Sequence, residues 1–260
     1  MRSVTAIDRA NRAGRMGLVV YTIPNFPNPS EYKRISALLL SDPSVTVIET
    51  TIPVDRGFSP HANSTIKRSH QVASQYSVNL TQFVKTVSSK KPHICVFYKH
   101  SHDSIGFNEF VRTTSSKLDG ILLEWNERNE KPYEAISKKN GVEFIKCVGP
   151  WMSKRKIQAL LSRTSDSPLV YLMSAEATGG KLFSAKALET TALLIKQYRP
   201  NAKVAAGFGI RGQKEIRQLA TIRGIDAVII GTEFLKQSRQ GSRRVTKFLK
   251  SLEGALCRVN

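Results

Sequence analysis

The stretch VAAGFGIRGQKEIRQLATIRGIDAVIIGT, residues 204–232, decides the fold. Two runs within it, Val204 to Gly207 and Ala227 to Ile230, are nearly all apolar, as expected for strands buried on both faces of a parallel sheet. The segment that joins them stops at Gly224, a residue type that commonly follows the last turn of a helix. The stretch therefore predicts two parallel strands with a helix between them.

The same alternation of apolar runs and amphipathic segments extends from one end of the chain to the other. Helix starts are indicated by Ser30, Ser153 and Ser184, whose hydroxyl groups can cap a first turn. The other candidate strands are Leu18 to Ile23, Val45 to Glu49, His93 to Tyr98, Gly120 to Leu123, Glu143 to Val148 and Leu169 to Met173.

Eight strand-and-helix units in 260 residues close most naturally into a (βα)8 TIM barrel, an α/β fold that commonly runs to about 250 residues. An open, doubly wound sheet is the alternative. Because no Gly/Ser-rich linker divides the chain, we place a single domain over residues 1–260. We expect it to begin with a short helix near Val4 to Ala13 and to end with a helix from Gly241 to Leu256.

Three glycine-containing turns in the last third of the chain each follow an apolar run, and together they predict one phosphate site. A backbone without a Cβ can approach an anion closely, and N–H groups where a strand leads into a helix supply the donors. In a TIM barrel such turns gather at the carboxyl ends of the strands. The candidate phosphate ligands are Gly179, Gly180, Gly209, Ile210, Gly231 and Thr232.

The composition argues against several classes of function. No apolar stretch approaches the roughly 20 residues that span a bilayer, and the N-terminus lacks the apolar core of a secretory signal, so we expect a cytoplasmic protein. The cysteines and histidines show no metal-ligand spacing, and no metal is predicted. The formal net charge is +20, but the basic residues are scattered and lack interleaved aromatic residues. This pattern favours solvated helix faces or an acidic partner protein over nucleic acid.

Glu49 ends the apolar run Val45-Thr46-Val47-Ile48, so its carboxyl group would project into the mouth of a barrel. Apolar neighbours would raise the pKa of this carboxyl group toward the range that is useful for general acid–base catalysis. On position alone, a carboxylate held in a salt bridge at the rim is an equal alternative.

Four stretches of the chain resemble the tryptophan synthase alpha chain family, in the right order. Ile48-Glu49-Thr50-Thr51-Ile52-Pro53 is similar to the family's Leu-Glu-Leu-Gly-x-Pro segment and matches Glu49 to the catalytic glutamate. The segment Tyr171-Leu172-Met173-Ser174, followed by Thr178-Gly179, resembles the sixth strand and its loop, and Tyr171 joins the candidate catalytic residues. The remaining phosphate turns are matched by Gly207-Phe208-Gly209-Ile210 and Ile230-Gly231-Thr232.

The resemblance implies a barrel that cleaves indole-3-glycerol phosphate into indole and glyceraldehyde 3-phosphate by a retro-aldol step, without a cofactor. It implies that Glu49 moves protons between the glycerol hydroxyl group and the indole carbon, while a second acidic group contacts the indole N–H and the glycine turns hold the phosphate. It also implies a tryptophan synthase beta chain as partner.

The sequence departs from the family at this second acidic group. After the proline the family reads approximately Phe-Ser-Asp-Pro-x-Ala-Asp-Gly-Pro, and its second aspartate is catalytic. Residues 54–64 here read VDRGFSPHANS, with no acidic residue at the matching place. Asp55 and His61 are the candidate substitutes, the latter because an imidazole can accept a proton near neutral pH. The stretch Leu122 to Asn126 also differs, at a segment that faces the beta chain in the family.

Three hypotheses follow for the function. The first is a carbon–carbon lyase of tryptophan biosynthesis that acts on indole-3-glycerol phosphate or a close analogue. The second is a catalytically impaired alpha-type subunit that binds a phosphate ligand and activates a beta chain, because the second carboxylate is missing. The third is a nucleic-acid-binding barrel, which rests on net charge alone and predicts an affinity that falls steeply with salt.

Overall fold

The apolar runs of the sequence form parallel strands in the computed structural model, which describes residues 1–76, 78–124, 127, 129–175, 178 and 180–258. Hydrogen-bonded neighbours in the sheet follow the order β5-β4-β3-β2-β1-β9-β8-β7-β6. The strands are β1 (Gly17–Tyr21), β2 (Val45–Thr50), β3 (His93–Phe97), β4 (Gly120–Leu123), β5 (Glu143–Phe144), β6 (Lys146–Val148), β7 (Leu169–Met173), β8 (Lys203–Gly207) and β9 (Ala227–Ile230).

The two ends of this order, β5 and β6, belong to one continuous segment that we expected as a single strand. Its first part pairs with β4 and its last part pairs with β7. Between them, the N–H of Ile145 donates to the carbonyl oxygen of Ile121 at 2.8 Å. The segment therefore closes the sheet on itself, which confirms the TIM barrel and excludes the open, doubly wound alternative.

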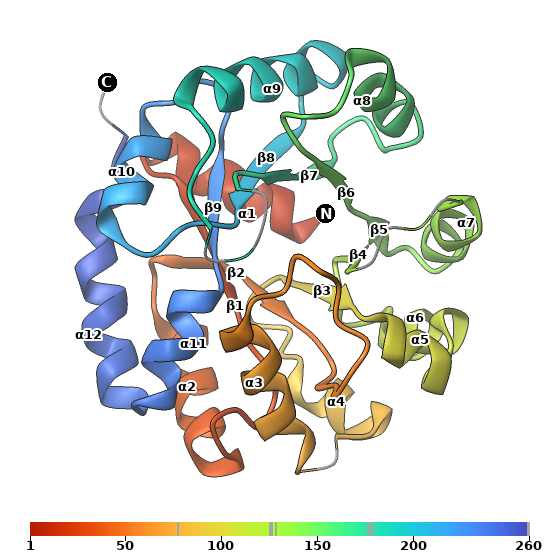
Figure 1. The fold of residues 1–260 in the computed structure, drawn as a ribbon, viewed down its shortest axis with the longest axis vertical. Helices are drawn as coiled ribbons and strands as arrows, with labels where there is room; N and C mark the ends of the chain where they lie inside the picture. The colour runs from red at the N-terminus through yellow and green to blue at the C-terminus, as the bar shows by residue number, and fades with distance from the viewer. Residues whose placement is uncertain (77, 125–126, 128, 176–177, 179, 259–260) are drawn as a thin grey trace.

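Helices surround the strands as an outer ring, which Figure 1 shows. An additional helix, α1 (Arg2–Arg12), precedes β1, and a short 3-10 helix (Glu253–Ala255) follows the last α-helix, so both expected terminal helices are present with slightly different bounds. The helices of the ring are α2 (Pro29–Ser41), α3 (Ser64–Ser74), α4 (Leu80–Thr86), α5 (Lys99–Ile105), α6 (Phe107–Thr114), α7 (Lys131–Lys139), α8 (Lys154–Leu161), α9 (Ala185–Tyr198), α10 (Gln213–Ala220), α11 (Thr232–Arg239) and α12 (Ser242–Leu252).

One of the three predicted helix caps is wrong. Ser153 and Ser184 cap α8 and α9 through their side chains, as expected. The cap of α2 is Asn28, whose side chain accepts a hydrogen bond from the N–H of Glu31 at 3.0 Å, and Ser30 lies inside the first turn. Pro29 explains the difference, because proline has no N–H and suits the first helical position, which makes the residue before it the cap.

Side chains alternate along each strand between the interior of the barrel and the surrounding helices. Val19 and Val47 belong to the interior cluster, whereas Leu18 and Val20 pack in the cluster beneath the helices. This period of two is the one expected for strands, and it carries every second residue of a strand to the axis of the barrel.

Helix α1 covers the amino ends of the strands, and in Figure 1 it crosses the centre of the barrel. Its Ile7 packs into the interior cluster. Two ion pairs hold it in place, Arg2 at its start with Asp119 at 3.0 Å and Asp8 in its middle with Lys203 at 2.7 Å. Because this end is closed, a ligand can reach the interior only from the carboxyl ends of the strands.

No helix in the described part of the chain is long and apolar enough to cross a membrane.

Candidate active site

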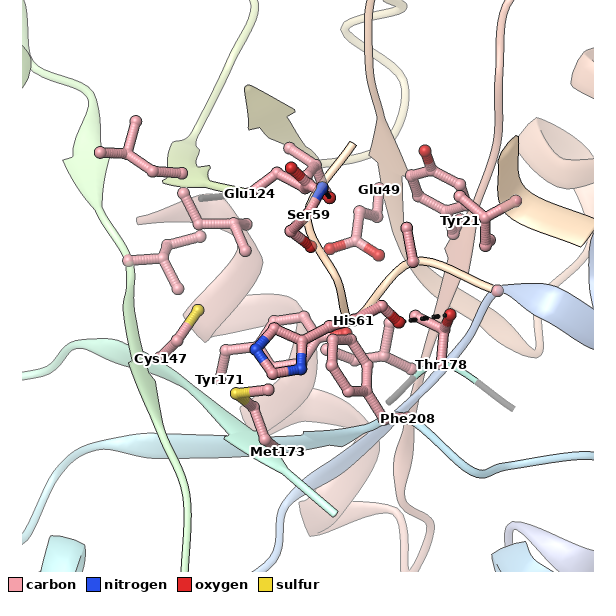
Figure 2. Close-up of a pocket in the computed structure, with 18 of the residues that line it drawn as sticks. Tyr21, Glu49, Ser59, His61, Glu124, Cys147, Tyr171, Met173, Thr178 and Phe208 are labelled. Carbon is pink, nitrogen blue, oxygen red and sulfur yellow. Dashed lines mark hydrogen bonds between the residues drawn. The ribbon is translucent and has the colours of Figure 1, made fainter. Parts of the chain in front are cut away.

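A cavity of about 1090 Å³ lies at the carboxyl ends of the strands, where a TIM barrel carries its site. Its lining combines apolar and polar side chains, which suits a ligand with an aromatic part and a charged part. The apolar wall includes Val96, Leu122, Ile145, Met173, Phe208 and Ile229. The polar groups include Tyr21, Glu49, His61, Tyr98, Glu124, Thr178 and Thr232, several of which are labelled in Figure 2.

Glu49 reaches into this cavity from β2 and is only 3% exposed. Its Oε1 atom is buried and has no hydrogen-bond partner among the described residues, and none of the ion pairs in that part of the chain includes it. Burial raises the pKa of the carboxyl group to about 8, because an unpaired charge is unfavourable away from water. This position favours the acid–base interpretation over the salt bridge at the rim, and the group is protonated at neutral pH.

Glu124 brings a second carboxyl group into the same cavity, directly after β4. Its Oε1 accepts a hydrogen bond from the N–H of Ser59 at 2.8 Å, whereas its Oε2 is buried and has no partner among the described residues. Burial raises its pKa to about 7, while the hydrogen bonds of Ser59 and the charge of Lys67 act in the opposite direction. Glu124 is therefore about half ionised at neutral pH.

A buried chain of hydrogen bonds ends at this polar side of the cavity. The N–H of Val54 donates to His70 Nδ1 at 3.2 Å, and His70 Nε2 lies 2.7 Å from the hydroxyl oxygen of Tyr21, which lies 3.2 Å from that of Tyr98. Burial lowers the pKa of His70 to about 3, so the ring is neutral and its proton is on Nε2. His70 therefore donates to Tyr21. Tyr21 and Tyr98 each have one hydroxyl proton, and one of these two protons forms the hydrogen bond between them. The other proton can be donated to a ligand in the cavity.

The two candidate substitutes for the missing aspartate lie in different places. The imidazole of His61 lines the cavity, and its carbonyl oxygen accepts hydrogen bonds from the N–H and the hydroxyl group of Thr178, both at 3.0 Å. The side chain of Asp55 is 60% exposed and does not line the cavity. It lies 3.5 Å from Nε2 of His100 and 3.9 Å from the guanidinium of Arg56. The structure therefore brings His61, but not Asp55, into the cavity of Glu49.

Tyr171, on β7, lies with its ring buried against the barrel wall and also lines the cavity. Burial, and next the charge of Glu49, raise its pKa well above the ordinary value, so its hydroxyl group stays protonated. A Cβ built on Gly207 would lie 2.3 Å from that hydroxyl oxygen, so the ring fits only because position 207 is a glycine.

Residues of all three phosphate turns line the cavity. Phe208 and Gly209 both have positive φ angles, 75° and 74°, and a Cβ on Gly209 would lie 2.7 Å from the carbonyl oxygen of Gly180. The turns after β7 and β8 are thus in backbone contact. Ile210 lines the cavity beside them, while Gly179 lies outside the described residues.

The third phosphate turn, after β9, leads directly into a helix. Gly231 and Thr232 line the cavity, and Thr232 is the first residue of α11. The first N–H groups of a helix have no partner within it and carry a partial positive charge. An anion placed against the two turns described above would therefore meet these N–H groups as well.

Asn63 fastens the loop that follows β2 to two of the phosphate turns. Its N–H donates to the hydroxyl oxygen of Thr178 at 2.8 Å, and its side-chain amide donates to the carbonyl oxygen of Thr178 at 2.8 Å and to the hydroxyl oxygen of Thr232 at 3.1 Å. Its side-chain oxygen caps α3. The loop that carries His61 is thereby held against these two turns.

Comparison with known proteins relates this chain to one family by sequence and by fold. A family model for the tryptophan synthase alpha chain matches residues 7–257. The chain belongs to the tryptophan synthase alpha chain family. A tryptophan synthase alpha chain from Pyrococcus furiosus is 25% identical over 234 residues, which cover 86% of this chain and 91% of that relative. One from a Cyanothece species is 28% identical over 125 residues, or 46% of each chain.

Solved structures support the family's barrel for this chain. A tryptophan synthase structure from Mycobacterium tuberculosis superposes with a TM-score of 0.83 at 19% identity, over 100% of this chain and 99% of the other. A tryptophan synthase alpha chain from Legionella pneumophila superposes with a TM-score of 0.79 at 18% identity, over 98% and 97%. At 19% and 18% identity these superpositions show a shared fold and nothing further.

Sequence reasoning missed Glu124 in this member of the tryptophan synthase alpha chain family. By sequence, residues 122–126 are only a stretch that departs from the family at a partner-facing segment. A signal was nevertheless present, because Glu124 follows the apolar run of β4, just as Glu49 ends the run of β2. Both are acidic residues where a barrel strand ends.

Proposed function

We propose that this protein is a lyase that cleaves indole-3-glycerol phosphate, or a close analogue, into indole and glyceraldehyde 3-phosphate. The observation that carries the proposal is Glu49, a buried acid without a partner among the described residues in the cavity of an alpha-chain barrel. A carboxyl group that is protonated at neutral pH can donate to the indole carbon, and as a carboxylate it can then accept the proton of the glycerol hydroxyl group.

The cavity suits both parts of this substrate. The apolar wall would hold the indole ring, and Tyr171 would pack against it. The phosphate group would bind Gly209, Ile210 and Gly231 together with the N–H groups at the start of α11, which begins at Thr232. Gly179 and Gly180, in the turn after β7, are the remaining candidates, and the carbonyl oxygen of Gly180 lies against Gly209. Such fixed contacts at both ends of the substrate would hold the reacting carbon near Glu49.

The second candidate function is a catalytically impaired alpha-type subunit that binds a phosphate ligand and activates a beta chain. The observation in its favour is the position of Asp55, which is exposed outside the cavity where it cannot replace the family's second aspartate. Under this alternative the beta chain would be the main target of the protein.

Indole release from indole-3-glycerol phosphate tests the first function, and beta-chain activation tests the second. The lyase predicts turnover well above that of Glu49→Ala. The impaired subunit predicts equal indole release by the parent and Glu49→Ala. It also predicts that a cognate beta chain converts indole to tryptophan faster when either the parent or Glu49→Ala is added. A wild-type rate equal to the Glu49→Ala background would refute the lyase.

A further inference from the structure

The loop that follows β2 lacks an acidic side chain in the cavity, yet it holds a carboxylate from another strand there. Asp55 points to solvent, while the N–H of Ser59 in the same loop donates to Glu124 at 2.8 Å. We propose that Glu124 is the second catalytic carboxylate and that it exchanges a proton with the indole nitrogen. This inference rests on the proposed lyase function.

The position of Glu124 is fixed by backbone contacts on both sides. Its own N–H donates to the carbonyl oxygen of Phe97 at 3.0 Å, which continues the ladder between β3 and β4 by one residue. Ser59 then holds Oε1, and Oε2 remains buried without a partner among the described residues. An oriented carboxylate with one open oxygen is suited to accept a proton from a ligand N–H.

The two carboxyl groups approach the cavity from different strands. Glu49 belongs to β2 and Glu124 follows β4, while β3, which ends just before Tyr98, lies between them. The register places Glu49 level with Ile94 and Ile94 level with Gly120, so Glu124 lies two strand spacings across and four residues further along than Glu49. Their backbones are therefore separated by roughly 16 Å, which leaves room for a ring between the side chains. In Figure 2 Glu49 and Glu124 are both directed into the cavity.

The surroundings make Glu124 the more acidic of the two groups. The pKa of Glu49 is raised to about 8 by burial alone, whereas the pKa of Glu124 is raised by burial only to about 7, since Ser59 and the charge of Lys67 oppose the shift. Glu124 therefore ionises more readily than Glu49. Two carboxyl groups whose pKa values differ in this way can serve as acid and base in one reaction.

Other titratable groups face the pair from the neighbouring elements. The hydroxyl groups of Tyr21 and Tyr98 stay protonated, because burial first, and then the charges nearby, including those of both glutamates, raise their pKa values. Charged groups from the residues after β4, from α8 and from the segment that follows α8 also line the cavity. These are Glu127, Glu130, Lys156 and Arg163.

The reaction balances with these two residues. Glu49 donates its proton to the indole carbon that bears the glycerol chain, while Glu124 takes the proton of the indole nitrogen, which leaves a C=N bond in the ring. Glu49 then takes the proton of the hydroxyl group on the adjacent glycerol carbon, and the bond between the two carbons breaks. The electron pair of the broken bond enters the indole ring, and the indole nitrogen takes its proton back from Glu124. Indole and the aldehyde leave, and both carboxyl groups are restored.

Turnover is the first test. In the full chain, Glu124→Gln should lower kcat for indole release by about 100-fold to 10,000-fold, the usual contribution of a general base. The affinity for glyceraldehyde 3-phosphate should change no more than a few-fold. Glu109→Gln is the matched control, because it removes an exposed carboxylate on α6 that pairs with Arg112, and it should keep the parent rate. A Glu124→Gln rate within a few-fold of the parent, with a large loss in His61→Gln instead, would overturn the proposal.

Binding is the second test, and it does not require turnover. The probes are 3-(indol-3-yl)propyl phosphate, which cannot be cleaved, and its benzofuran counterpart, in which oxygen replaces the N–H. At pH 8 the parent should prefer the indole probe by about 10-fold to 100-fold, as a hydrogen bond to a charged group predicts. Glu124→Leu should lose this preference, and Glu109→Leu should keep it.

The two tests separate the proposal from the lyase function on which it rests. If the parent releases no indole, the lyase function fails, and the probe pair still decides whether Glu124 contacts the nitrogen. Equal binding of the two probes by the parent, or the same preference in Glu124→Leu, would refute the role of Glu124.

Discussion

Replacing Glu49 by Gln is expected to stabilise the protein more at pH 7 than at pH 5, because the wild-type side chain resists ionisation where it lies. Its pKa is about 8 in the folded state, against an ordinary value of 4.5, and burial is the cause. Between these two values the unfolded chain loses the proton and the folded chain keeps it. Wild-type stability therefore falls as pH rises through this window, and Gln, which does not titrate, removes that contribution.

The size of the effect follows from the two pKa values. The penalty is below about 1 kcal/mol at pH 5 and reaches about 3 kcal/mol at pH 7, so the difference between variant and wild type should shift by about 2 kcal/mol between them. Any constant effect of the amide group cancels in this comparison. Urea unfolding at pH 5, 6 and 7 measures it, with Glu109→Gln as the control whose difference from wild type should stay flat across this range.

A shift below about 0.5 kcal/mol between pH 5 and pH 7 would refute the reasoning, because it would mean that Glu49 ionises as easily in the folded protein as in the unfolded chain. The acid–base role that depends on a raised pKa would then lose its physical basis.

Three further predictions concern other parts of the structure. Asn28→Ala should lower the free energy of unfolding by about 1 kcal/mol, measured by urea, because α2 loses its cap. If Ser30→Ala lowers the free energy of unfolding and Asn28→Ala does not, Ser30 is the cap and this assignment is wrong. Gly209→Ala should weaken glyceraldehyde 3-phosphate binding by about 10-fold or more in calorimetry, because a Cβ at φ 74° would lie 2.7 Å from a carbonyl oxygen. Gly141→Ala is the control and should bind normally, because Gly141 has a similar φ of 70° but open space around its Cβ position. His70→Leu should destabilise the protein by about 2 to 4 kcal/mol in urea, since it leaves the buried N–H of Val54 without a partner and removes one hydrogen bond from Tyr21. A loss below about 0.5 kcal/mol would contradict the hydrogen-bond chain.

The sequence was sufficient for the strands and the barrel, because buried parallel strands are recorded in it as apolar runs. It was less informative where the outcome depends on contacts between distant segments. The division of residues 143–148 between two neighbouring strands, which closes the barrel, leaves no trace in a run that reads as one strand. The cap at Asn28 could have been predicted from Pro29, whereas Ser30 looked equally suitable by residue type alone.

Within the candidate site, the position of Glu49 could be predicted because it ends an apolar run. The orientation of Asp55 could not, since a residue next to Arg56 in a loop can face either solvent or cavity. The hydrogen bond from Ser59 to Glu124 joins residues 65 apart in sequence, and no local pattern encodes it. The paired carboxyl groups therefore emerged only from the fold.

The most direct test of the central claim is to mix the protein with indole-3-glycerol phosphate and to measure both products over the same time course. We predict that indole and glyceraldehyde 3-phosphate form in equal amounts, that Glu49→Gln lowers the rate by about 100-fold or more, and that Glu109→Gln leaves it unchanged. Equal rates for the wild type and Glu49→Gln, or indole without its aldehyde partner, would contradict the claim that this cavity cleaves the substrate with Glu49.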